Sequence, residues 1–389
     1  MSGLIRAIDP AGSLDDHAKS SLTRDLSHAA KTSTVNDYAP YFLQWQHYCL
    51  AKGLQDIPAD PFALACYLSV SSDGDASAHP TKKRLCSINF FHDCANQPKP
   101  GSDPFVQQIY KGIRKRLGSP GAPKDPLTLA QIQTARDCAV SQNESGLVFI
   151  ADICSIMQEA TTRWDDIADL RLGDMIWSTE VVRLLIVDSK TDNLRHGQYA
   201  TIAVSTDPDS AYQKLCQLIL QGIQGFASLP GTTKQRLLAE LQAQHTTLPF
   251  PTPETSEIGT APDHILSAAA ACGLPLENLP LLGSWPWTTS PKSLLGTLSY
   301  KAFLSHVKKL FCHLPNIATH SLRRGGATEK LGAGIEARLV QWIGRWKSAE
   351  AFEGYIDSRV NIAAASRAMT QARETASRSR NSNDALRGS

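Results

Sequence analysis

The stretch from Gly118 to Pro126 constrains the fold of this chain most strongly. It holds three prolines and two glycines in nine residues. Proline lacks the backbone donor that a helix needs and glycine weakens regular structure, so no helix is expected to continue through this stretch. A chain of 389 residues is also longer than most single domains. We therefore predict residues 119–127 as a linker between a domain at 32–118 and a domain at 128–375.

The part of the chain before the linker is predicted to be entirely helical. Apolar residues recur every three or four positions over 35–49, which is typical of a helix, with a kink or a late start at Pro40. Aspartate followed by proline at 60 and at 103 predicts two more helix starts, because aspartate caps a helix and proline suits its first turn. Another helix is expected over 81–94. Phe62 and Phe105 are expected to face the core.

Basic residues are concentrated between Pro80 and Lys124. This stretch holds nine lysines and arginines against two aspartates, a local charge of +7, whereas the whole chain carries a formal net charge of only +2. Such a block is typical of a surface that binds nucleic acid, although a merely solvated helix face also fits it. The candidate DNA-binding residues are Lys82, Lys83, Arg84, Lys111, Arg114 and Lys115.

Beyond the linker the pattern predicts helices together with a small sheet. Helices are expected at 128–140, 145–160 and 211–222, with another capped by Ser299. Alternating apolar residues at 181–187 and 199–204 predict two strands joined by a polar turn that carries Lys190. The segment 226–287 is rich in proline, threonine and serine, and we interpret it as an elaboration of the same domain. The predicted fold class is mainly α with a small β-sheet.

The ends of the chain and the cysteines add a few expectations. Residues 1–31 are polar and are predicted to be irregular and flexible. Residues 360–375 are predicted as a short amphipathic helix, followed by a disordered tail at 376–389. The nine cysteines include no Cys-x-x-Cys pair, which favours reduced thiols and an intracellular protein. No apolar run is long enough for a membrane span, so no membrane partner is expected.

A stretch near the C-terminus carries the residues with the clearest chemistry. His320 and Arg323 are three residues apart, which places both side chains on one face of a helix. Both can donate hydrogen bonds to a phosphate. Taken alone, such a pair is more often a satisfied histidine beside a solvated arginine. The stretch continues to Trp346, twenty-three residues after Arg323, and to Tyr355, nine residues further on.

These residues and their spacing resemble the C-terminal signature of the tyrosine recombinases of the phage-integrase type, with a Cre-like tryptophan at 346. The segment 161–175 resembles the first arginine box of this family. There Arg163 matches the catalytic arginine and Asp166 matches an acidic position at which glutamate is common. The helices of 32–118 resemble the core-binding domain of Cre-like recombinases, a SAM-like domain. The resemblance covers about residues 34–372.

The resemblance implies a complete set of catalytic residues. Tyr355 would be the nucleophile, and Arg163 and Arg323 would clamp the non-bridging oxygens of a DNA phosphate. Lys190 would be the general acid that protonates the leaving 5′-hydroxyl. No metal and no nucleotide cofactor is implied.

The remaining matched residues would assist this chemistry. His320 would orient the phosphate or help to remove the Tyr355 proton. Trp346 would donate its indole N–H to the phosphate, and Asp166 would hold Arg163 or His320 in place.

The function implied by the resemblance is site-specific DNA recombination. It would proceed through a 3′-phosphotyrosyl intermediate and a Holliday junction, with two domains forming a C-shaped clamp and a homotetramer assembling on double-stranded DNA with a specific, inverted-repeat target. The protein would be DNA-associated, in the bacterial cytoplasm or nucleoid or in a eukaryotic nucleus. Alternatives are a type IB topoisomerase, a telomere resolvase, and a domesticated DNA-binding protein that no longer cuts.

Overall fold

The computed structural model describes residues 15–29, 32–118, 124–186, 197–243, 261–274, 279–281 and 298–356. The chain forms two compact units, Met1–Ala122 and Pro123–Ser389. The division between them falls inside the stretch 119–127. The identification of the first unit as a core-binding domain and of the second as a catalytic domain stays a prediction. The C-shaped clamp stays a prediction as well.

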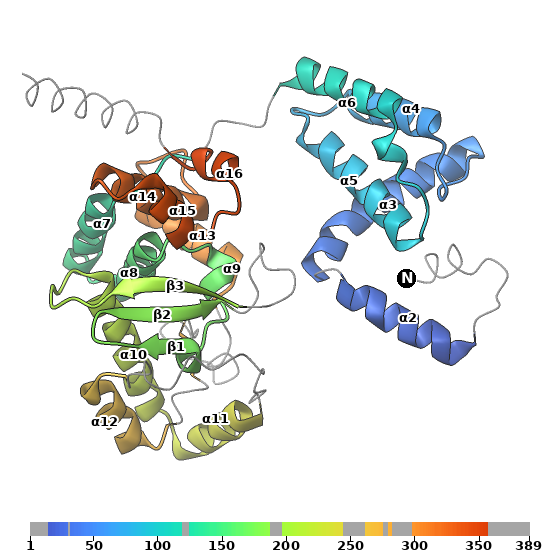
Figure 1. The fold of residues 1–389 in the computed structure, drawn as a ribbon. Coiled ribbons are helices and arrows are strands. Elements are labelled where there is room, and N and C mark those ends of the chain that lie inside the picture. Colours follow the sequence, from blue (N-terminus) through green and yellow to red (C-terminus); the bar gives the residue numbers. More distant parts are fainter. Residues whose placement is uncertain are drawn as a thin grey trace, which may run out of the picture. The chain divides into compact units, whose positions relative to one another are not determined.

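In the described residues, the first unit contains helices only (Figure 1). They are α2 (Asp16–Ala29), α3 (Thr32–Lys52), α4 (Pro61–Ser71), α5 (His79–Cys94), the short 3-10 helix η1 (Pro100–Ser102) and α6 (Pro104–Leu117). Asp60 and Asp103 cap α4 and α6 as predicted: their carboxylates accept hydrogen bonds from the backbone N–H groups of Ala63 and Phe105 at 2.9 and 2.8 Å.

The structure corrects two expectations about the N-terminal part. Residues 16–29 form a regular helix, which Asp15 begins by accepting a hydrogen bond from the Ala18 N–H at 2.6 Å. A capped run without proline or glycine has no local reason to stay irregular. Helix α3 begins at Thr32 and runs through Pro40, so the late start is wrong, whereas the alternative of a kink at Pro40 stays a prediction.

The core of the first unit is built from side chains on α3 to α6. Trp45, Leu64, Leu68, Ile88 and Val106 are completely buried. Phe62 and Phe105, which were expected to face this core, are 64% and 45% exposed and stack on each other. Phe62 lies two residues before the buried Leu64, which on a helix is a rotation of about 200° and turns it to the outer face.

The second unit combines helices with one small antiparallel sheet. Its elements are α7 (Leu129–Ser141), α8 (Ser145–Glu159), α9 (Trp164–Ile167), η2 (Leu172–Asp174), β1 (Met175–Trp177), β2 (Val181–Ile186), β3 (Gln198–Ala203), α10 (Ala211–Ala227), α11 (Gly231–Ala243), α12 (Asp263–Cys272), α13 (Tyr300–Leu310), α14 (Thr319–Gly332), α15 (Ala337–Ile343) and α16 (Ala349–Glu353). The chain is thus mainly α with a small β-sheet, as predicted. The strand order is β1-β2-β3.

The sheet follows the alternation in the sequence. In β2, Val182, Leu184 and Ile186 are buried while the residues between them are half-buried, which is the period-two pattern of a strand with one face on the core. Ile202 pairs with Val182 and Ala200 with Leu184. Strand β1 was not predicted, because three residues are too few to show an alternation.

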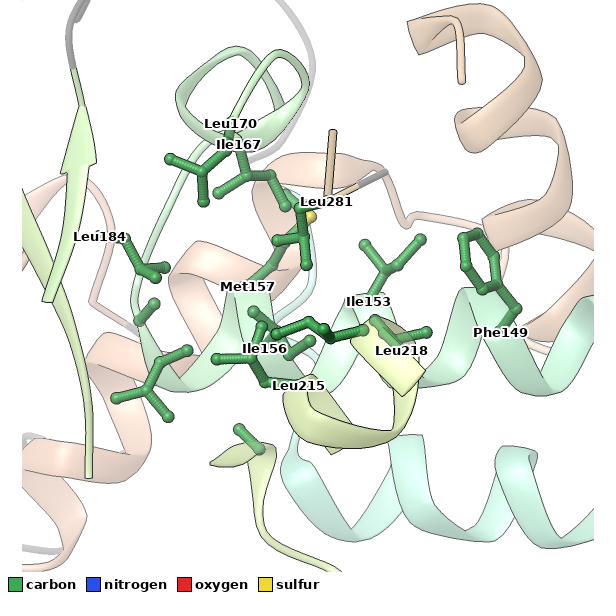
Figure 2. Close-up of a cluster of buried hydrophobic side chains, with 14 of the residues drawn as sticks. Phe149, Ile153, Ile156, Met157, Ile167, Leu170, Leu184, Leu215, Leu218 and Leu281 are labelled. Carbon is green, nitrogen blue, oxygen red and sulfur yellow. The ribbon is translucent and has the colours of Figure 1, made fainter. Parts of the chain in front are cut away.

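Helix α8 is the centre of the second unit. It is buried continuously from Phe149 to Gln158, as expected of a helix surrounded by other elements. Figure 2 shows Phe149, Ile153, Ile156 and Met157 of this helix packed with Ile167, Leu170, Leu184, Leu215, Leu218 and Leu281. The C-terminal end of α8 leads directly into the segment that holds Arg163.

Several predictions for this unit have clear outcomes. The segment 226–287, which gave no pattern, contains α11 and α12. Ser299 caps α13 as predicted, by accepting from the Ala302 N–H at 3.2 Å. The turn with Lys190, the helix expected at 360–375 and the tail lie outside the described residues. No helix in the described part of the chain is long and apolar enough to cross a membrane.

Candidate active site

Helix α14 supplies His320 and Arg323 and is anchored tightly against the core. The chain enters it through the extended residue Ala318, whose N–H donates to the Ser321 hydroxyl at 3.1 Å. Glycine at 325 lets this helix approach the backbone of Leu127, just before α7, because a Cβ at 325 would lie 1.8 Å from the Leu127 carbonyl oxygen. The first turns of α14 are therefore fixed in place.

Arg323 is a completely buried arginine. Its Nη1 donates to the Thr161 carbonyl at 2.5 Å and its Nη2 donates to the Gly344 carbonyl. Both acceptors lie in turns that contain a residue with positive φ. Thr161 itself has φ 53°, and Arg345, which follows Gly344, has φ 59°. The Arg323 side chain thus joins the end of α8 to the turn after α15.

A buried ion pair connects the first arginine box to the same turn. Arg345 Nη2 lies 2.5 Å from Asp166 Oδ2, and the two side chains are 5% and 1% exposed. The same carboxylate oxygen accepts a hydrogen bond from the Arg163 backbone N–H at 2.9 Å. The Asp166 carboxylate therefore binds the backbone of Arg163 and the side chain of Arg345.

Trp346 and Tyr355 cover the Arg323 guanidinium. The guanidinium carbon lies 4.2 Å from the centre of the Trp346 ring and 5.6 Å from the centre of the Tyr355 ring, and the two rings are 5.2 Å apart. Gly344 makes room for this arrangement, since a Cβ there would meet the Trp346 ring at 1.6 Å. Arg324 Nη1 donates to the Gly354 carbonyl at 2.6 Å and so fixes the turn that carries Tyr355.

His320 reaches the group from the solvent side. Its side chain is exposed, and its ring meets the Tyr355 ring edge-on with 6.0 Å between centroids. The structure thus brings together five of the six predicted catalytic residues, separated by up to 192 positions in the sequence: Arg163, His320, Arg323, Trp346 and Tyr355. Lys190, the sixth, lies outside the described residues, and its assignment remains a prediction.

Unsatisfied donors are concentrated in this cluster. Among the described residues, the buried nitrogens without a hydrogen-bond partner include Arg163 Nη1, Arg323 Nε, two nitrogens of Arg345 and the Trp346 indole nitrogen. Buried donors in proteins are almost always paired, so a group of them in one place needs a reason. A bound anion with several acceptor oxygens would satisfy such donors.

The charges of the cluster are also unbalanced. Burial lowers the pKa of Arg323 to about 9, and the nearby positive charges of Arg163 and Arg345 act in the same direction. Burial also lowers the pKa of Arg345, against the opposing effect of its partner Asp166. Three arginines thus face one neighbouring carboxylate, Asp166, within the described cluster. This electrostatic setting favours an anionic ligand.

Two residues of the cluster were not predicted from the sequence. Arg345 had no signal beyond standing next to Trp346, and its partner Asp166 is 179 positions away. Arg324 likewise had no signal beyond standing next to Arg323. A local clue existed only for Asp166, which stands three residues after Arg163 in a spacing that suits a helix N-terminus.

The predicted DNA-binding residues of the first unit fall into two groups. Lys82, Lys111, Arg114 and Lys115 are exposed. Lys83 instead pairs with Asp37 at 2.6 Å, and Arg84 pairs with Asp75 at 2.6 Å with both side chains nearly buried. The exposed group is therefore the better candidate for contacts with a polyanion.

Comparison with known proteins gives a match to a recombinase. The chain is 25% identical over 182 residues to an integrase/recombinase xerD homolog of Selenomonas ruminantium. The chain is thus similar in sequence to a recombinase. The match covers 46% of this chain and 53% of that protein, so the chain spans about half the length of the curated relative. No family model matches the chain.

Solved structures give similar matches at low identity. The XerA recombinase is 12% identical, with a TM-score of 0.34 over 90% of this chain and 98% of its own. The Tn1549 transposon integrase in complex with transposon right end DNA is also 12% identical, with a TM-score of 0.41 over 91% of this chain and 93% of its own. These values transfer no residue role and no activity to this chain.

Proposed function

We propose that this protein is a site-specific tyrosine recombinase that cleaves and rejoins DNA through a 3′-phosphotyrosyl intermediate. The observation that carries the proposal is the group of buried, unpartnered nitrogen donors next to the Tyr355 ring. A DNA phosphodiester offers the two non-bridging oxygens that such donors would bind. Double-stranded DNA is the substrate class that fits both this group and the exposed basic residues of the first unit.

In the proposed reaction, the Tyr355 hydroxyl oxygen attacks the phosphorus and the bond from phosphorus to the 5′-oxygen breaks. Negative charge grows on the phosphate during this step. Arg163 and Arg323 would stabilise that charge, since guanidinium groups stay charged and match the geometry of phosphate oxygens. The Trp346 indole N–H would add a neutral donor.

Two proton movements accompany the step. A phenol is mostly protonated at neutral pH, so its proton must leave as the bond to phosphorus forms. His320 would orient the phosphate or take this proton, a role supported by the contact of its ring with that of Tyr355. The leaving 5′-oxygen needs a proton, and Lys190 remains our candidate general acid. Rejoining reverses these movements with a 5′-hydroxyl as the nucleophile.

The burial of Arg323 adds one requirement. Its guanidinium is completely buried beneath Trp346 and Tyr355. A phosphate can therefore reach the Arg323 Nε only when one of these rings moves aside. Tyr355 is the half-buried ring and Trp346 the buried one, so we infer that Tyr355 turns when DNA binds.

The larger assembly belongs to the same proposal. Exchange of strands between two sites requires several nucleophiles, so we propose a homotetramer on specific, inverted-repeat DNA and a Holliday junction. The exposed side chains of Lys82, Lys111, Arg114 and Lys115 would hold the duplex by phosphate contacts, which position DNA without reading its sequence. The protein would then be DNA-associated inside the cell.

The decisive experiment detects the covalent bond directly. Purified protein is incubated with fragmented genomic DNA from its own source, denatured with detergent and digested with nuclease and protease. Mass spectrometry should find a nucleotide attached to the peptide that contains Tyr355. Tyr355→Phe removes only the hydroxyl and should abolish the adduct while DNA binding persists. Tyr300→Phe, which changes a 47% exposed tyrosine on α13, is the matched control and should form normal adducts.

The result also separates the alternatives. A nucleotide attached to another residue, or adducts that persist in Tyr355→Phe, would contradict the assignment. Relaxation of supercoiled DNA without recombinants would indicate a topoisomerase, and hairpin ends would indicate a telomere resolvase. DNA binding by the wild-type protein with no adduct on any fragment would indicate a DNA-binding protein that no longer cuts.

A further inference from the structure

Arg345 occupies a central position in the site without matching any predicted catalytic residue. It is 8% exposed, and its backbone lies in the left-handed region with φ 59°. Residues other than glycine, asparagine and aspartate rarely adopt this conformation. Such a conformation costs free energy and persists where the surroundings enforce it. The enforcing contacts are visible on both sides of the residue.

The side chain of Arg345 acts on the first arginine box. Its Nη2 binds Asp166 Oδ2 at 2.5 Å, and this same oxygen receives the backbone N–H of Arg163 at 2.9 Å. Because Arg345 holds the Asp166 carboxylate, Asp166 fixes the first turn of α9, which Arg163 immediately precedes. Trp164 packs this turn onto α13 by stacking on Phe303 with 4.2 Å between ring centres. Arg345 therefore helps to fix the backbone position of Arg163, from which the Arg163 side chain extends.

The backbone of Arg345 acts on the second arginine. The carbonyl of Gly344, the residue before it, accepts from Arg323 Nη2, and the Arg345 N–H donates to the Trp342 carbonyl at 2.9 Å. Trp346, the residue after it, covers the Arg323 guanidinium at 4.2 Å. The turn around Arg345 thus positions the Gly344 carbonyl that Arg323 binds and the Trp346 ring that covers Arg323.

We propose that Arg345 is a positioning residue, which holds Arg163 through Asp166 and Arg323 through its own turn so that both guanidinium groups face one phosphate. This inference rests on the proposed function. It predicts that loss of the Arg345 side chain misplaces the two arginines, and a misplacement of about 1 Å can lower a reaction rate on the order of a hundredfold. DNA binding, which depends mainly on phosphate contacts elsewhere, should change little.

The experiment measures single-turnover adduct formation on a DNA fragment captured by the wild-type protein. Arg345→Met should slow adduct formation on the order of a hundredfold at unchanged DNA affinity. Arg345→Gly keeps a residue that favours positive φ but has no guanidinium, and it should be equally slow. Arg345→Lys keeps the charge near Asp166 and should recover part of the rate.

A second buried ion pair in the same unit provides the matched control. Arg136 Nε binds Asp152 Oδ1 at 2.6 Å between α7 and α8, with the aspartate side chain 1% exposed. Arg136→Met should lower the melting temperature as Arg345→Met does, yet form adducts at the wild-type rate at temperatures where both variants are folded.

The outcomes distinguish the two proposals. Wild-type rates in Arg345→Met, or a full rate in Arg345→Gly, would overturn the positioning role while leaving the recombinase proposal intact. An equal loss of rate in Arg136→Met would overturn it as well, because the effect would then come from general loss of stability. Absence of any wild-type adduct would instead contradict the recombinase proposal itself.

Discussion

Replacing Arg323 by methionine tests whether this arginine is kept for a ligand or for the fold. Methionine has a similar length and no charge, so the variant keeps most of the packing under Trp346 and Tyr355. Burial and the neighbouring arginines lower the pKa of Arg323 by more than three pH units from the usual value of an arginine, to about 9. At about 1.4 kcal/mol per pH unit, the buried charge costs on the order of 5 kcal/mol of folding free energy at neutral pH.

The substitution removes this cost but also two hydrogen bonds. The Thr161 and Gly344 carbonyls would lose their Arg323 donors, at about 1–3 kcal/mol for each buried acceptor left unpaired. Gain and loss are of similar size, so we expect the free energy of unfolding to change by less than about 2 kcal/mol. Adduct formation should nevertheless fall on the order of a hundredfold to a thousandfold, as for loss of one preorganised donor.

Arg345→Met provides the contrast. It leaves Asp166 buried without its charged partner, and breaking a buried pair from one side costs about 3–5 kcal/mol. Urea unfolding followed by far-UV circular dichroism would give both values, with equal slopes showing that the same surface unfolds. If Arg323→Met loses as much stability as Arg345→Met, then Arg323 holds the fold together and our reasoning about a charge reserved for a phosphate is refuted.

Three further predictions follow from other parts of the structure. The wild type should gain stability relative to Arg323→Met as pH rises above about 9, because the folded protein then releases the Arg323 proton while the unfolded chain still keeps it; a difference in unfolding free energy that does not change with pH would argue against the lowered pKa. Gly325→Ala should lower the melting temperature strongly, since its Cβ would lie 1.8 Å from the Leu127 carbonyl oxygen, whereas Gly332→Ala on the same helix meets nothing within 4 Å and should be harmless. Neutralising Lys111, Arg114 and Lys115 should reduce the slope of DNA affinity against salt by about one unit for each lost phosphate contact, and more than neutralising the ion-paired Lys83 and Arg84.

Local chemistry explains why much of the fold could be predicted from the sequence. The Asp-Pro pairs at 60 and 103 and the serine at 299 state where helices begin, because a side-chain oxygen there satisfies a backbone donor. The alternation in β2 states which face is buried. These signals act over a few residues and do not depend on the rest of the chain.

Features set by tertiary packing could not be predicted in this way. Phe62 was expected on the buried side of its helix, but the rotation of α4 is decided by Leu64 and Leu68, which are completely buried. Strand β1 exists because β2 offers it a partner, from Met175 against Leu184 to Trp177 against Val182. Neither outcome can be derived from the spacing of residues within one element.

The site shows the same division between local and distant determinants. Spacing within α14 put His320 and Arg323 on one helix, and resemblance added Arg163, Trp346 and Tyr355. The role of Arg345 could not be found in this way, because it depends on a left-handed turn and on a carboxylate 179 positions away. A sequence pattern can identify residues that would touch a ligand more readily than those that hold them.

The buried charges connect stability with function in this protein. Three arginines share one carboxylate in the described cluster, and burial lowers the pKa of Arg323 and of Arg345. A fold selected for stability alone would gain by replacing such groups with apolar ones, since buried charges rarely repay their loss of hydration. A phosphate that enters the cluster would supply the missing negative charge and the missing acceptors together. The same donors that destabilise the free protein would then stabilise the DNA complex, and most strongly the transition state, in which the phosphate carries the most charge.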